Sequence, residues 1–238
     1  MVRITAKDVT VEFPVYGSRL FKSAFINTAT GGRLLKGARD RVVVKALNKV
    51  SFEFVEGDRV GLMGPNGSGK TTLLRVLAGA FEPVSGTAVV EGSLTCMLGI
   101  WLGMDMDATG YENIYMRSTL MGLSRREIEP HVPEIVEFCE LGDYLSMPLR
   151  TYSSGMGLRL AFAISTSVPA DVLLMDEWMS VGDSSFSAKA EGRLRRLIDQ
   201  ARILVVASHS ENLVRSICNK VVHLSHGEIT HIEETRPA

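Results

Sequence analysis

Residues Gly64 to Thr72 read Gly-Pro-Asn-Gly-Ser-Gly-Lys-Thr-Thr and match the pattern G-x-x-x-x-G-K-[ST]. The glycines let the backbone turn its N–H groups inward around phosphate oxygens, in conformations that a side chain would forbid. The stretch from Asp58 to Met63 predicts a buried strand, and Thr71 to Ala80 predicts a helix whose positive end faces the phosphates. This strand–loop–helix context is what a phosphate-binding loop requires, and it places the chain in the α/β class.

Bulk composition excludes several other functions. The chain has 238 residues, of which 45% are hydrophobic and 22% charged, as in an ordinary globular protein. Its net charge of −1 provides no electrostatic footprint for nucleic acid. No apolar run approaches the ~18 residues of a spanning helix, and the N-terminus has no signal-peptide pattern. Three cysteines without metal-ligand or disulfide spacing indicate unrelated buried thiols and a reducing, cytoplasmic setting.

Strand and helix patterns alternate along most of the chain, which predicts a mostly parallel sheet covered on both faces. The segments from Val2 to Phe13, from Val42 to Phe54 with a turn near Leu47-Asn48, and from Thr87 to Leu98 have a more antiparallel pattern. Residues 14–40 interrupt these strands as an insertion, either partly helical or a solvated loop. Residues 110–168 form a long helical block that we expect to be a separate subdomain.

Two acids end an apolar strand that runs from Val172 to Asp176. Nucleotides bind at the carboxyl ends of strands in open α/β sheets, so Asp176 is positioned to hold Mg²⁺ through water. The side chain of the next residue, Glu177, points in a different direction from that of Asp176. It can accept a proton from an attacking water. The alternative, two acids that only end a strand, is disfavoured by the phosphate loop earlier in the chain.

Two further polar residues are candidates for the site. His209 comes directly after a strand that ends at Ser208, from where it can donate a hydrogen bond to a γ-phosphate; the alternative, a structural histidine, is disfavoured by its position after the acidic strand. Asp183 lies just past Glu177 and leads into a helix, so it is either a helix cap, a functional residue or both.

A second anion-binding pattern lies at Tyr152-Ser153-Ser154-Gly155-Met156, where small residues begin a helix. Such a start exposes backbone N–H groups and the positive helix end to an anion. One nucleotide site already has a phosphate loop. A second cradle in the same chain makes sense if it serves a nucleotide held by another copy.

These motifs occur in the order found in ATP-binding-cassette (ABC) ATPases, and the resemblance covers nearly the whole chain. The chain is most similar to the nucleotide-binding subunits of bacterial exporters of O-antigen, capsule or teichoic acid. The supporting features are the Tyr-Ser-Ser-Gly-Met segment in place of Leu-Ser-Gly-Gly-Gln, the run Ser180-Val181-Gly182-Asp183, the insertion at 14–40, and a glycine-containing loop from Leu98 that leads to Thr109-Gly110-Tyr111-Glu112-Asn113-Ile114.

The resemblance implies a P-loop NTPase fold of the ABC type over residues 1–238, with a mixed sheet core, an antiparallel β subdomain and a helical subdomain. It implies ATP and Mg²⁺ as cofactors. The phosphate-binding residues are then Gly64, Pro65, Asn66, Gly67, Ser68, Gly69, Lys70, Thr71 and Thr72. Asp176 and Thr71 support Mg²⁺, Glu177 is the catalytic base and His209 senses the γ-phosphate.

The same resemblance implies a homodimer in which Ser153, Ser154 and Gly155 complete the site of the opposing subunit. Asp183 would communicate across that dimer. An aromatic side chain near the end of the first strand would stack on adenine. Phe13 matches by spacing and Tyr16 is the competing candidate, while the alternative is an ordinary core phenylalanine and a surface tyrosine.

One position departs from the family pattern. Most such ATPases have a glutamine after the strand that follows residue 94, but Ile100 lies near that place and no glutamine occurs from 94 to 113. Either another group takes its role, or coupling runs through the loop 98–107. There, Trp101 and Met104 fit either a contact with a membrane partner or ordinary core packing.

The function implied is ATP hydrolysis that powers export of a lipid-linked polysaccharide, O-antigen or capsule, across the bacterial inner membrane. The chain would lie peripherally on the cytoplasmic face and require a membrane permease. The alternatives are export of another substrate such as teichoic acid, a soluble ABC ATPase without a transport role, and a P-loop kinase, which would not explain the second cradle. The chain ends soon after His209, so we expect no C-terminal sugar-binding domain.

Overall fold

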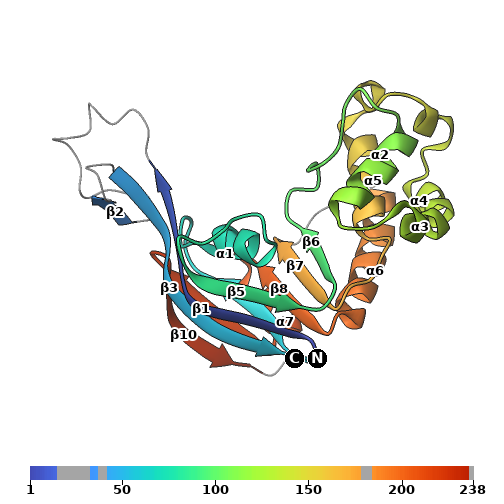
Figure 1. Ribbon diagram of the computed structural model, residues 1–238. Helices are drawn as coiled ribbons and strands as arrows, with labels where there is room; N and C mark the ends of the chain where they lie inside the picture. Colours follow the sequence, from blue (N-terminus) through green and yellow to red (C-terminus); the bar gives the residue numbers. More distant parts are fainter. Residues whose placement is uncertain (15–32, 37–41, 178–183, 236–238) are drawn as a thin grey trace. The chain divides into compact units, whose positions relative to one another are not determined.

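The computed structural model of the protein describes residues 1–14, 33–36, 42–177 and 184–235. The chain divides into two compact units (Figure 1). The first, here called the sheet unit, comprises Met1–Gly92, Leu174–Glu177 and Arg202–Ala238. The second, here called the helical unit, comprises Ser93–Leu173 and Trp178–Ala201.

Four strands of the sheet unit form an antiparallel sheet. Its order is β2-β3-β1-β5, with bounds Arg33–Lys36, Val42–Val55, Arg3–Pro14 and Ser85–Glu91. Alternate residues of β1 turn inward, and Ile4 and Ala6 are buried. The strands predicted from Val2 to Phe13 and from Val42 to Phe54 therefore occur, and β5 covers the first part of the predicted segment from Thr87 to Leu98. Strand β2 is an additional strand within the stretch 14–40.

The turn predicted near Leu47 and Asn48 is wrong, because β3 continues through both residues. Pairing with β1 shifts register here, from Val9 opposite Val50 to Val11 opposite Leu47, and Lys49 takes a left-handed φ of 48°. An irregularity of this kind is a β-bulge, which twists the strand without ending it.

The second sheet carries the motifs. In the sheet unit its order is β10-β9-β4-β8-β7, with bounds Glu228–Glu234, Lys220–Ser225, Arg59–Met63, Ile203–Ala207 and Val172–Asp176. Strand β4 is parallel to both β8 and β9, whereas β10 returns antiparallel to β9. All five residues of β8 are buried, as expected for a central parallel strand.

Helices α1 (Lys70–Leu77) and α7 (Glu211–Ile217) belong to the same unit. Gly61 of β4 lies close to Val214 of α7. A Cβ on Gly61 would fall within 3.3 Å of the Val214 Cβ, so glycine allows this close approach. The strand–loop–helix order predicted around the phosphate loop is confirmed.

The helical unit contains the predicted helical block. Its α-helices are α2 (Gly110–Leu120), α3 (Arg125–Ile128), α4 (Val132–Cys139), α5 (Ser154–Ser165) and α6 (Ser184–Gln200), with short 3-10 turns between α3 and α4 and between α4 and α5. Thr109 caps α2 and Ser124 caps α3, each in a capping box with the glutamate three residues later. Phe138, Phe162 and Phe186 pack their rings together in the core.

Strand β6 (Leu94–Met97) lies in the six-stranded sheet beside β7, and not in the antiparallel sheet that the sequence pattern predicted for residues 87–98. The Val172 N–H donates a 2.9 Å hydrogen bond to the Ser93 carbonyl at this edge. Within the described residues, none of the helices has the length and apolar character needed to cross a membrane.

Candidate nucleotide site

The phosphate loop depends on three glycines in left-handed backbone conformations. Gly64, Gly67 and Gly69 have φ angles of 151°, 74° and 107°. A side chain at Gly64 would run into the Leu224 carbonyl of β9, and one at Gly69 would come within 2.7 Å of the Ala46 carbonyl. Neither position accepts a Cβ, so this path of the loop backbone requires glycine at both places.

Lys70 begins helix α1 and is 7% exposed. Its Nζ donates hydrogen bonds to the Gly64 carbonyl at 2.7 Å and the Pro65 carbonyl at 3.2 Å. Burial lowers the pKa of Lys70, while the charges of Asp176 and Glu177 act in the opposite direction. The ammonium group is therefore held against the rim of the loop, close to two acids.

Thr71 and Asp176 meet as the sequence predicted. The Thr71 hydroxyl donates a 2.7 Å hydrogen bond to Oδ2 of Asp176, although the two residues lie 105 positions apart. One comes from the first turn of α1 and the other from the carboxyl end of β7. A hydroxyl and a carboxylate side by side are the hard oxygen ligands that suit Mg²⁺.

Glu177 and His209 also come together. His209 Nε2 lies 3.6 Å from Oε1 of Glu177, and the two side chains are 49% and 64% exposed. Glu177 has a left-handed φ of 67°, which is unusual for a residue with a side chain. A 2.8 Å hydrogen bond from its N–H to the Ala207 carbonyl at the end of β8 holds this conformation. Backbone strain of this kind costs about 1–3 kcal/mol and is common at functional sites.

The residues predicted to contact adenine and to signal across a dimer are only partly described. The Phe13 ring packs edge-on against the Phe81 ring at 5.3 Å and remains 36% exposed. Tyr16 and Asp183 lie outside the described residues.

In the helical unit, Ser153 caps helix α5 by accepting the Met156 N–H at 3.3 Å. This leaves Ser154 and Gly155 as the first two residues of the helix. A Cβ on Gly155 would meet nothing closer than the Ser153 Oγ at 4.0 Å. The protomer's own packing therefore does not require a glycine at this position.

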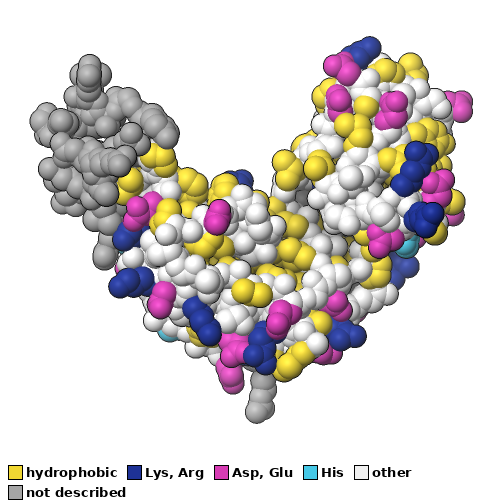
Figure 2. Space-filling model, in the orientation of Figure 1, with side chains coloured by type: hydrophobic (Ala, Val, Ile, Leu, Met, Phe, Trp, Pro, Cys, Tyr) yellow, Lys and Arg dark blue, Asp and Glu magenta, His cyan; other side chains and the backbone are white. Residues whose placement is uncertain are grey.

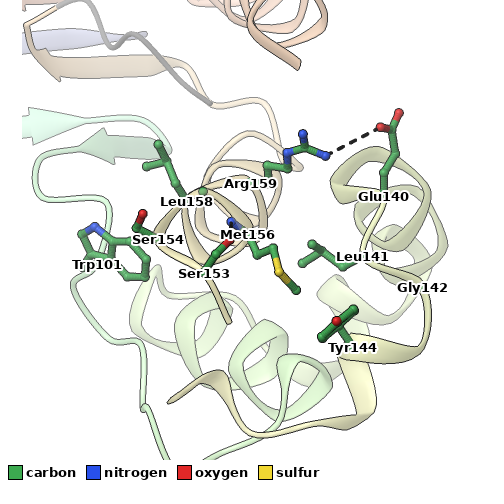
Figure 3. A pocket seen from close by; sticks show the side chains of 11 residues that line it. Trp101, Glu140, Leu141, Gly142, Tyr144, Ser153, Ser154, Met156, Leu158 and Arg159 are labelled. Atoms are coloured by element: carbon green, nitrogen blue, oxygen red, sulfur yellow. Dashed lines mark hydrogen bonds and ion pairs between the residues drawn. The ribbon is translucent and has the colours of Figure 1, made fainter. Parts of the chain in front are cut away.

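A cavity of about 850 Å³ opens beside this helix start (Figure 3). Met156 extends toward Leu141 and Tyr144 on one side of the helix, while Trp101 lies on the other side near Ser154. An ion pair between Arg159 and Glu140 closes the far rim at 4.0 Å, and Lys189 reaches the other Glu140 oxygen at 2.6 Å. The lining is thus apolar beside the small residues and charged at the edge.

Trp101 belongs to this site, which the sequence did not decide. A Cβ on Gly157 would come within 2.5 Å of the Trp101 ring, so the indole packs directly on the backbone of α5. The ring nevertheless remains 43% exposed. Trp101 therefore packs on the helix, and its exposed part leaves the contact with a membrane partner as a prediction.

Two buried polar side chains of α2 hold the loop that contains Trp101. Asn113 accepts the Asp105 N–H at 2.7 Å and donates to the carbonyls of Asp105 and Thr109, each at 2.9 Å. Arg117 bridges the Leu102 carbonyl and the Ser165 hydroxyl of α5, and burial lowers its pKa to about 10. Asn113 was noted only as part of the run from Thr109 to Ile114, and Arg117 was not noted, because polar residues on a helix are normally solvated.

A family model described as ABC transporter matches residues 47–180. The chain belongs to this family, and the prediction of an ATP-binding-cassette ATPase that binds ATP is confirmed.

Curated relatives extend the similarity over nearly the whole chain. The O-antigen export system ATP-binding protein RfbE of Yersinia enterocolitica is 43% identical over 96% of this chain and 97% of its own length. RfbB of Klebsiella pneumoniae, with the same description, is 35% identical over 96% of this chain and 92% of its own. The teichoic acids export ATP-binding protein TagH of Listeria innocua is 34% identical over 99% of this chain and 68% of its own.

A solved structure of the ATP-binding cassette MJ0796, described as a dimeric post-hydrolysis state bound to ADP and Pi, has the same fold. The TM-score is 0.69 at 19% identity, over 99% of this chain and 100% of that one.

Proposed function

We propose that this chain is the ATP-hydrolysing subunit of a transporter that exports a lipid-linked polysaccharide of the O-antigen or capsule type. The observation that carries the proposal is the 43% identity to an O-antigen export protein over 97% of that protein's length. Similarity to TagH favours teichoic acid as the second candidate cargo. The net charge of −1 agrees with a protein that does not bind nucleic acid.

The phosphate loop from Gly64 to Thr72 would bind the ATP phosphates through its N–H groups and Lys70. Thr71 and Asp176 would hold Mg²⁺, and their 2.7 Å contact supports this because both offer oxygen to the same point. When bound, Mg²⁺ supplies positive charge to the phosphate oxygens.

Glu177 would act as general base on the attacking water, with His209 as donor to the γ-phosphate. Their 3.6 Å separation and shared exposure support a joint role at one end of the sheet. Phe13 or Tyr16 would stack on adenine, and the exposed Phe13 ring is compatible with that role.

Ser153, Ser154 and Gly155 would complete the site of a second copy of this chain, and Asp183 would communicate between the copies. The support is the open space at Gly155, since a glycine that the fold does not need fits the close approach of a ligand. The N–H groups at the start of the 12-residue helix α5 supply the positive end for that anion.

A membrane permease would bind the helical unit through the loop 98–107, and the subunit would lie on the cytoplasmic face of the inner membrane. Large apolar side chains reach the surface of this unit (Figure 2), and in the loop Leu102 is 75% exposed and Met106 51%. Because Arg117 ties Leu102 to Ser165 and Trp101 packs on Gly157, movement of the loop would reach α5 directly.

Copurification tests the transport role. We expect the chain to copurify with a candidate permease, and the permease in lipid to stimulate ATP hydrolysis several-fold. Trp101→Ala should reduce the stimulation while ATP binding is retained. Failure to associate with that permease, with unchanged hydrolysis in its presence, would contradict the transport proposal.

Ser154→Arg tests the shared site. The added side chain would project from the start of α5 into the space reserved for the opposing nucleotide, so we expect it to block ATP-dependent dimerisation of a Glu177→Gln variant. Size-exclusion chromatography with light scattering measures the dimer. Ser85→Arg, on the exposed start of β5, adds the same charge in the sheet unit and should dimerise normally. Normal dimerisation of the Ser154→Arg chain would count against the shared site.

A further inference from the structure

Three metal-ligating side chains meet on the last β-hairpin, outside the nucleotide site. His223 of β9 and His231 of β10 are cross-strand partners, and their rings stack at 4.0 Å with an interplanar angle of 11°. Glu233 lies two residues after His231, so it is on the same face of β10. One ligand atom from each of the three side chains lies within 4.8 Å of the other two.

Thr230 lies beside one ring nitrogen of His231. The Thr230 hydroxyl donates to the His223 carbonyl at 3.1 Å, and its oxygen also lies 3.2 Å from Nδ1 of His231. In the tautomer in which Nδ1 donates to this oxygen, Nε2 of His231 has a lone pair for a ligand.

The other two ligand atoms face each other. His223 Nε2 is buried and has no hydrogen-bond partner, although the Oε2 atom of Glu233 is 3.6 Å away. Arg215 of α7 holds the second carboxylate oxygen, Oε1, at 3.2 Å and orients the group. The same contact holds the pKa of Glu233 below its usual range, so the carboxylate is ionised.

We propose that His223, His231 and Glu233 form a binding site for a divalent transition-metal ion of the Zn²⁺ class. Two imidazoles and one carboxylate, with a fourth position open to water, are an established tetrahedral Zn²⁺ ligand set. At Zn–ligand distances of about 2.0–2.1 Å, tetrahedral ligand atoms lie about 3.3 Å apart. The three atoms here need to approach one another by about 1.5 Å at most, which rotation of the exposed His231 side chain and the half-buried Glu233 side chain permits.

The site is close to the phosphate loop along the backbone. His223 is the parallel partner of Met63, the residue before Gly64, and the Gly227 N–H of the same hairpin donates to the Ser68 carbonyl at 3.0 Å. A metal that joins β9 to β10 would therefore stabilise the strand on which the loop rests.

Titration of the full chain with ZnCl₂ in excess Mg²⁺, followed by calorimetry, tests the proposal. We expect one Zn²⁺ per chain from this site and a rise in Tm of about 5 °C at saturation. His231→Ala and Glu233→Gln should each weaken binding at least about tenfold. His231 is exposed, so its loss should leave the fold intact.

Controls separate this site from other zinc ligands. His131→Ala, in the helical unit, and His209→Ala, beside Glu177, should bind Zn²⁺ as the wild type does at this site. With Co²⁺ as the probe, the spectrum should show imidazole and carboxylate ligation without a thiolate charge-transfer band, which separates it from the three free cysteines. Unchanged affinity in a His223→Ala, His231→Ala double variant would overturn the proposal.

Discussion

Glu177→Gln should lower kcat for ATP hydrolysis about a thousandfold while ATP still binds. Glutamine has the shape of glutamate but cannot accept a proton, so the proposed base is removed and little else changes. The N–H bond to the Ala207 carbonyl comes from the backbone and survives the substitution. Loss of a negative charge near the phosphates should leave the affinity for ATP equal or higher. Single-turnover hydrolysis and equilibrium binding of a fluorescent ATP analogue measure the two quantities.

The matched control for this variant is Glu91→Gln, at the exposed end of β5. It makes the same chemical change away from the phosphate loop and should hydrolyse ATP at the wild-type rate. Undiminished turnover in the Glu177→Gln chain would remove Glu177 as the base. Loss of ATP binding along with turnover would instead assign Glu177 a role in holding the nucleotide.

Local chemistry made much of the fold predictable. Glycines fixed the end of β4 and the start of α1, because only they tolerate φ angles such as 107° at Gly69. Ser153 marked the start of α5 because its hydroxyl caps the helix.

Predictions that depend on distant partners were less successful. The Leu47-Asn48 region has turn-like residues, but pairing with β1 carries the strand through it as a bulge. Strand β6 lies beside β7, where Ser93 and Asp171 form three hydrogen bonds with each other. No local pattern in 87–98 reveals this contact. The pairing of strands is decided by contacts across the fold and not by propensity.

In the functional site too, residues within a local motif were predictable, whereas contacts between distant parts of the chain that carry no motif were not. Thr71 and Asp176 were each recognisable from a motif, and their meeting followed from the rule that ligands bind at the carboxyl ends of parallel strands. Trp101 could not be assigned, since its contact with Gly157 depends on how a loop folds onto a helix far along the chain. The His223–His231 pair required the hairpin register, which shifts by an irregularity between Ile229 and His231.

Lys70→Ala should weaken ATP binding about a hundredfold. The Lys70 ammonium group is almost fully buried and donates to the two carbonyls at the rim of the loop, and a bound phosphate would offer it charged acceptors instead. A hydrogen bond to a charged group contributes about 1.5–3 kcal/mol, and about 3 kcal/mol corresponds to the expected loss. Equilibrium dialysis with labelled ATP measures the dissociation constant.

The substitution also removes two hydrogen bonds from the loop itself, so its effect on folding must be separated from its effect on binding. Thermal unfolding of the nucleotide-free variant measures the effect on folding. A Lys70→Arg variant gives a second test of the effect on ATP binding. Arginine keeps the charge, but its larger planar group does not fit the buried position, so it should also bind ATP weakly. Lys7→Ala removes an equal charge from the exposed face of β1 and should bind ATP normally. Unchanged ATP affinity in a folded Lys70→Ala chain would contradict the phosphate-loop assignment on which the proposed reaction rests.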